Sequence, residues 1–68
     1  MDFTYNDDIS TIRTEAPHRG LILDAQEPLV VSPDVYLFNA YEIDSKRHLR
    51  FRATVVRGIV VFERVGFV

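Results

Sequence analysis

Cysteine and tryptophan are absent from this sequence, and its 68 residues include only three glycines and three prolines. Without cysteine, the chain can form neither a disulfide nor a thiolate metal site. Small secreted domains usually depend on such cross-links, so we expect a protein of a reducing compartment, the cytoplasm. The acidic start of the sequence lacks the basic and apolar regions of a signal peptide. No apolar run approaches the roughly 20 residues of a membrane span, so we expect no membrane association.

Side chains that carry chemistry are also scarce. His18 and His48 are the only histidines, and no group of His, Asp and Glu has the spacing of a metal site. The three glycines form no phosphate-binding loop, and the three serines lie in no nucleophile motif. A chain this short also has little material to enclose a pocket while keeping a core. We therefore predict that the protein is not an enzyme, and that it has no cofactor, no metal ion and no small-molecule substrate.

The composition instead indicates one folded domain over residues 1–68. Hydrophobic residues make up 47% of the chain and charged residues 26%, which is ordinary for a globular protein and unlike a disordered one. A domain near this length buries only about 60% of the surface that its unfolded chain exposes. Such a domain is only marginally stable by itself.

Alternating apolar side chains predict three consecutive antiparallel strands at residues 35–44, 48–56 and 59–68. We predict that the first loop has three residues, Ser45 to Arg47, because this loop brings apolar side chains together across the hairpin. A loop of two residues would instead place Glu42 against Leu49. The pairs expected in the preferred register are Ile43 with Leu49, Tyr41 with Phe51, Leu37 with Val55, Glu42 with Arg50, and Asp44 with His48.

The second turn is predicted at Arg57 and Gly58, since glycine accepts a positive φ without steric cost. The pairs expected across this turn are Val56 with Ile59, Ala53 with Phe62, and Arg52 with Glu63. Residues 59–62 are apolar on both faces, and such a strand is usually covered on both sides. The cover expected here is the N-terminal third of the chain or a second copy of the protein.

The N-terminal half contains two short predicted strands, at residues 20–23 and 29–31. Residues 9–16 are ambiguous, because Ile9, Ile12 and Ala16 share one helical face whereas the intervening Thr and Ser residues are mediocre helix formers. We favour a strand that folds back on the next one. The expected pairs are then Ile12 with Leu23 and Thr14 with Leu21.

The predicted fold is all-β: a small antiparallel meander of about five strands, forming a curled sheet or a small barrel. The alternative is an α+β fold with a short helix at residues 7–16.

Charge is unevenly distributed along the chain. Residues 1–45 contain nine acidic residues and two arginines, whereas residues 46–68 contain six basic residues and one glutamate. Either the two halves pack together and neutralise each other, or a basic face meets an acidic partner. Basic residues interleaved with an aromatic ring also occur in nucleic-acid-binding sheets. However, alternation places Phe51 on the face opposite Arg50 and Arg52, and an acidic chain is an unusual nucleic-acid binder.

One predicted sheet face combines apolar and charged residues. Tyr36 and Phe38 are expected there, at the end away from the charged pairs. An apolar patch ringed by charge is typical of an interaction site, unless the N-terminal segment covers it. The candidate interface residues are Tyr36, Phe38, Arg47, Arg50, Arg52 and Arg57.

From these features we predict a small non-enzymatic protein that binds and occupies the surface of a partner protein, either a different protein or a second copy. Inhibitors of a host machine that are carried by phages or mobile elements have this profile. One alternative is a small β protein that binds nucleic acid through residues 46–57. Another is a structural subunit of a symmetric assembly such as a virion.

Overall fold

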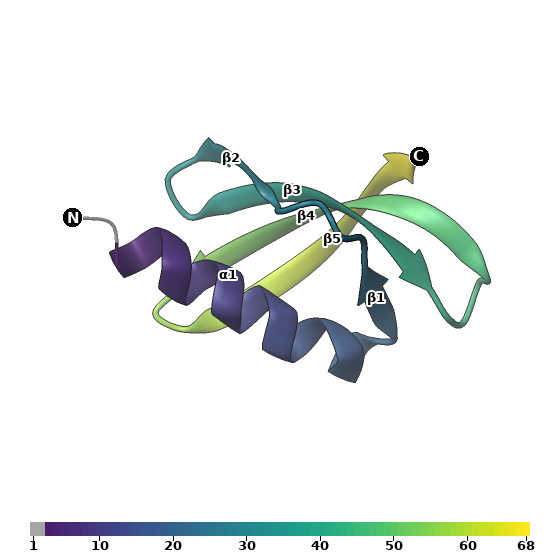
Figure 1. Cartoon of the computed structure of the whole chain (residues 1–68), viewed down its shortest axis with the longest axis horizontal. Helices are drawn as coiled ribbons and strands as arrows, with labels where there is room; N and C mark the ends of the chain where they lie inside the picture. Colours follow the sequence, from purple (N-terminus) through teal and green to yellow (C-terminus); the bar gives the residue numbers. More distant parts are fainter. Residues whose placement is uncertain (1–2) are drawn as a thin grey trace.

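The computed structural model describes residues 3–68 of the chain, with side chains described from residue 6 onward. A helix packs on one side of a five-stranded antiparallel sheet, which makes two layers (Figure 1). The elements are α1 (Phe3–Glu15), the short 3-10 helix η1 (Ala16–Arg19), β1 (Leu21–Leu23), β2 (Leu29–Ser32), β3 (Val35–Glu42), β4 (Arg47–Val56) and β5 (Ile59–Phe67). The predicted antiparallel sheet of five strands is confirmed, and α1 is the helix of the α+β alternative.

The sheet is open rather than closed into a barrel. Its strand order is β1-β3-β4-β5, and β2 also pairs with β3. β1 lies opposite residues 40–42 of β3 and β2 lies opposite residues 35–37, so the two short strands share one edge of the sheet. β5 forms the other edge.

The strand favoured for residues 9–16 is wrong, because residues 9–15 belong to α1 and Ala16 begins η1. Ile9, Ile12 and Ala16 recur at helical spacing. Each packs against the sheet and is at most 5% exposed. The hydroxyls of Thr11 and Thr14 donate to backbone carbonyl oxygens four residues earlier, at 2.9 Å in both cases. Burial of the apolar stripe therefore outweighs the mediocre helix propensity of the residues between.

The hairpin between β4 and β5 has the predicted turn and the predicted pairs. Arg57 and Gly58 adopt φ values of 53° and 77°, the two positive φ angles that a two-residue type I′ turn requires. The register places Val56 opposite Ile59, Ala53 opposite Phe62, and Arg52 opposite Glu63. A bulge follows beyond Phe51 and Arg64, where Val65 is the extra residue.

The hairpin between β3 and β4 differs from the prediction. Phe51 lies opposite Phe38 rather than Tyr41, a shift of three residues, and an odd shift exchanges the two faces of a strand. The connecting loop spans residues 43–46, where Lys46 has a φ of 59° and its N–H donates to the Glu42 carbonyl oxygen at 2.8 Å. The shift stacks the rings of Phe38 and Phe51, whose centroids are 5.8 Å apart. The predicted pairs of Ile43, Tyr41, Leu37, Glu42 and Asp44 with β4 therefore do not form.

The core lies between α1 and the sheet. Tyr36 and Phe38 are 3% and 6% exposed, so of the two alternatives left open by the sequence, the N-terminal segment covers these rings and they belong to the core. The Tyr36 hydroxyl donates to Oδ2 of the buried Asp8 at 2.5 Å, which ties β3 to α1. The buried apolar residues are Ile9, Ile12, Ala16, Leu21, Tyr36, Phe38, Ala40, Leu49, Phe51, Ala53, Val55 and Val60.

Replacing Ile12 with Ala should lower the free energy of unfolding by about 2–5 kcal/mol, because it leaves a cavity at a fully buried site. The measurement is urea unfolding followed by circular dichroism. Ser10→Ala, on the exposed side of the same helix, is the control and should change the stability little. Equal effects of the two substitutions would contradict the packing of α1 on the sheet.

Replacing Tyr36 with Phe should cost about 1–3 kcal/mol, because it removes a hydroxyl that donates to the buried Asp8 carboxyl group. Tyr41→Phe is the matched control, since Tyr41 lies on the other face of β3 and is 39% exposed. The same unfolding measurement applies to both variants. A loss for Tyr41→Phe as large as that for Tyr36→Phe would argue against this contact.

Candidate interaction surface

The side of the sheet opposite α1 has no cover among residues 3–68 (Figure 1). Side chains alternate along each strand, so the neighbours of the core residues point to this side. We call it the open face. Ile59 is 70% exposed and Val61 is 61% exposed. The apolar end of the open face consists of Leu29, Val31, Val35, Leu37, Val56, Ile59, Val61 and Val65.

A shallow depression of about 470 Å³ crosses the middle of the open face. Arg52 and Glu63 border it and form an ion pair, in which Arg52 Nε donates to Glu63 Oε1 at 3.1 Å. This pair is the predicted one. The two opposite charges offset each other, so the apolar end adjoins a polar but locally neutral surface.

Polar contacts continue toward the far end of the open face. Arg50 Nε donates to Asn39 Oδ1 at 3.3 Å, and His48 Nε2 lies 2.7 Å from Asp24 Oδ1. The predicted pairs of Arg50 with Glu42 and of His48 with Asp44 are therefore wrong. Both follow from the three-residue shift between β3 and β4.

The six predicted interface residues do not form one site. Tyr36 and Phe38 are core residues, as described above. Arg50 and Arg52 lie on the open face with Phe51 behind them in the core, as alternation predicted. Arg57 is in the β4–β5 turn, and Arg47 lies over the ring of Phe67, with its guanidinium carbon 5.3 Å from the ring centroid.

Sequence reasoning missed the contribution of β2 and β3 to the open face. Leu29 lies opposite Leu37, and Ser32 opposite Val35, so these strands extend the apolar end beyond β4 and β5. The signal was present in the sequence, because residues 29–31 and 35–38 are apolar at both odd and even positions. Such runs indicate an apolar face on each side of the strand, but not which one the helix covers.

Glu42 is held at the other end of the sheet, on the side of α1. Arg64 Nη2 donates to both of its carboxylate oxygens, at 3.0 and 3.1 Å. A hydrogen bond from the Ser45 side chain is the largest cause that holds the pKa of the Glu42 carboxyl group below its ordinary value. Burial opposes this shift, and the contact with Arg64 adds to it. The ionised form of Glu42 is therefore favoured.

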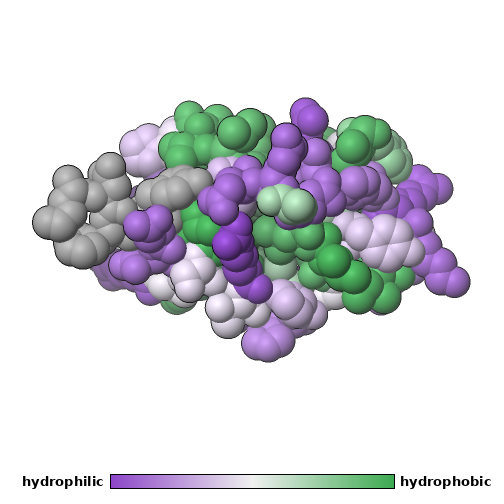
Figure 2. Space-filling view, in the orientation of Figure 1, coloured by the Kyte–Doolittle hydropathy of each residue, from purple (hydrophilic) through white to green (hydrophobic). Residues whose placement is uncertain are grey.

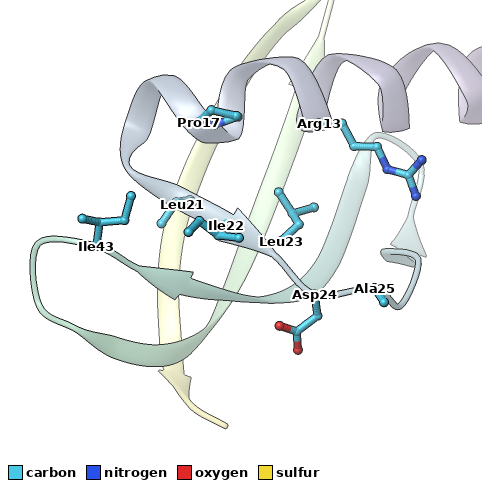
Figure 3. Close-up of a pocket in the computed structure, with 8 residues that line it drawn as sticks. All are labelled: Arg13, Pro17, Leu21, Ile22, Leu23, Asp24, Ala25 and Ile43. Carbon is cyan, nitrogen blue, oxygen red and sulfur yellow. The ribbon is translucent and has the colours of Figure 1, made fainter.

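A second recess lies between the end of α1, η1, β1 and the β3–β4 loop (Figure 3). Its volume is about 450 Å³, and most of its lining is apolar, including Pro17, Ile22 and Ile43. Figure 2 shows hydrophobic surface in this region, next to the helix. Its charged residues already have partners, because Arg13 Nη2 donates to Glu27 at 2.6 Å and Asp24 contacts His48. The recess therefore offers apolar contact without a free polar group to orient a ligand.

No three potential metal ligands from His, Cys, Asp and Glu lie together in the part of the chain that the structure describes. Within the same residues, no helix is both long and apolar enough to span a membrane.

Comparison with known proteins gives no relative: no family model, no curated protein and no solved structure matches this chain.

Replacing Glu42 with Gln should destabilise the protein more at pH 7 than at pH 3. The folded-state pKa of Glu42 is lowered, so its contribution is present above the unfolded pKa and is lost as pH falls through the folded value. Urea unfolding at both pH values provides the measurement. Asp44→Asn, in the adjacent exposed loop, is the control. A loss for Glu42→Gln that does not depend on pH would show that its charge is not responsible.

Proposed function

We propose that the protein is a non-enzymatic binding module whose open face occupies the surface of a partner protein. The observation that carries this proposal is the apolar end of the open face, where Ile59, Val61 and Leu29 are each more than 60% exposed. Apolar patches bordered by polar groups are characteristic of protein interfaces. The neutral Arg52–Glu63 pair beside the patch suits a contact dominated by apolar burial.

The need for a cover supports this proposal. Strands that are apolar on both faces are usually buried on both sides. Here α1 covers one side, as expected of the N-terminal third of the chain, and the described elements leave the other side bare. A protein partner supplies the missing layer, and it is either a different protein or a second copy that packs sheet on sheet.

Two finer points stay predictions, because only the small size of the chain supports them. They are the role as an inhibitor of a host machine and the origin in a phage or mobile element.

The virion-subunit alternative predicts a mass in solution that rises with concentration. Light scattering over a range of concentrations separates self-assembly from a complex with a different protein.

Replacing Val61 with Lys should abolish partner binding without unfolding the protein, because it places a charge within the exposed apolar patch. The measurement is a tagged pull-down at low salt from a lysate of the source organism, treated with nuclease, with the eluate identified by mass spectrometry. Ser10→Lys introduces the same charge on the exposed side of α1 and is the matched control. Circular dichroism confirms that each variant is folded.

The expected result is a defined set of proteins retained by the wild type and by Ser10→Lys, and lost with Val61→Lys. The same set with all three proteins would place the binding surface elsewhere. An eluate without a partner, combined with a monomeric mass at all concentrations, would reject the proposal.

A further inference from the structure

Cationic and aromatic side chains of β4 and β5 lie together at the end of the sheet that α1 does not reach. Phe67 lies opposite Leu49 and therefore shares the α1 side of the sheet with Arg47 and Arg64. The sequence suggested that rings and guanidinium groups fall on opposite faces. That holds for Phe51 with Arg50 and Arg52, but not for this corner, because the bulge at Val65 resets the alternation of β5.

Two adjoining depressions, of about 380 and 340 Å³, meet at Arg64. Arg19 from η1 lines the first, and Arg47 from β4 lines the second together with Phe67. Lys46 lies next to Arg47 in the β3–β4 loop. We call this set, Arg19, Lys46, Arg47, Arg64 and Phe67, the basic corner.

The cations of the basic corner are largely unneutralised within the chain. Arg64 is paired with Glu42, but Arg19, Lys46 and Arg47 form no ion pair with any described side chain, residues 6–68. The acidic groups nearby are Glu42, already engaged by Arg64, the loop residue Asp44, and Glu15 at the end of α1, whose Oε2 lies 3.6 Å from His18 Nδ1. They are fewer than the four cations of the corner. The corner therefore retains an excess of positive charge although the whole chain carries a net charge of −2.

Part of the negative charge lies at the opposite end of the molecule, which extends 37 Å on its longest axis. The start of α1 with Asp7 and Asp8, and the β2–β3 turn with Asp34, are at one end (Figure 1). η1, the β3–β4 loop and the C-terminal end of β5 are toward the other end (Figure 1). This separation keeps Asp7, Asp8 and Asp34 away from an anion bound at the basic corner.

The aromatic ring of the corner is accessible. Phe67 is 68% exposed, and the guanidinium group of Arg47 covers one face of its ring, 5.3 Å from the centroid. An exposed ring beside unpaired guanidinium groups is the combination that binds a base by stacking and its phosphates by charge.

We infer that the basic corner binds single-stranded nucleic acid, with phosphates on Arg19, Lys46 and Arg47 and a base stacked on Phe67. An acidic peptide would use the cations but not the ring, so the exposed Phe67 favours a nucleic acid. The inference is independent of the proposed function, because the basic corner and the apolar end of the open face lie on opposite sides of the sheet.

The test is fluorescence anisotropy of labelled single-stranded DNA and RNA 12-mers with the full chain, at 50 and 200 mM salt. Arg47→Gln should weaken binding by about tenfold and reduce the salt slope by about 0.7, the loss of one phosphate contact. Phe67→Ala should weaken binding at least fivefold, the lower end of the range for one stacked base. Arg57→Gln, which removes the same charge in the β4–β5 turn at the other end, should change binding less than twofold.

Any one of the following results would overturn the inference. One is the absence of saturable binding at 50 mM salt. Another is an equal loss from Arg57→Gln and Arg47→Gln, which would indicate general charge attraction. A third is competition by polyglutamate as effective as that by an unlabelled 12-mer, or binding of duplex as tight as that of single strands. Val61→Lys should bind the 12-mers like the wild type, so failure of this inference is distinguishable from failure of the proposed function.

Discussion

The structure depends on the packing of one apolar stripe of α1 and η1 against one side of the sheet. Ile9 and Ile12 of α1 and Ala16 of η1 are almost fully buried there, and the Tyr36 hydroxyl reaches Asp8 of α1. A chain of this size has material for one such layer, and placing it decides which side of every strand becomes core. The open face is the other side of the same strands. Its exposed apolar side chains are therefore a direct consequence of where α1 lies, and they carry the proposal of a protein-binding surface.

The register between β3 and β4 has the next largest consequence. β3 is apolar on both faces, with Tyr36, Phe38 and Ala40 on one and Val35 and Leu37 on the other, so hydrophobicity alone does not select a register. The packing of three rings does: Phe38 stacks on Phe51 and meets Phe62 edge to face, each at 5.8 Å between centroids. Exchanging the faces of β3 moved two predicted interface aromatics into the core. It also gave Glu42 and His48 different partners from those that the loop length suggested.

The lopsided charge of the sequence is only partly neutralised by folding. Among the described side chains, the contacts of Glu42 with Arg64 and of Asp24 with His48 join the acidic half to the basic half. The pairs of Arg13 with Glu27 and of Arg52 with Glu63 instead lie within one half. Three of the remaining cations, Arg19, Lys46 and Arg47, gather at the basic corner, beside an exposed ring. Basic and aromatic side chains therefore share one face where β4 meets the end of β5, although alternation separates them around Phe51.

Sequence alone determined the features that depend on neighbouring residues. The turn at Arg57 and Gly58, the register of β4 with β5 and the pair of Arg52 with Glu63 follow from a glycine that accepts a positive φ and from alternation across a short loop. Only the tertiary structure decided that residues 9–16 form a helix, which face of β3 is buried, and which surface stays open. These outcomes depend on contacts between distant segments, since an ambiguous segment adopts the conformation that buries its apolar side chains against the rest of the chain.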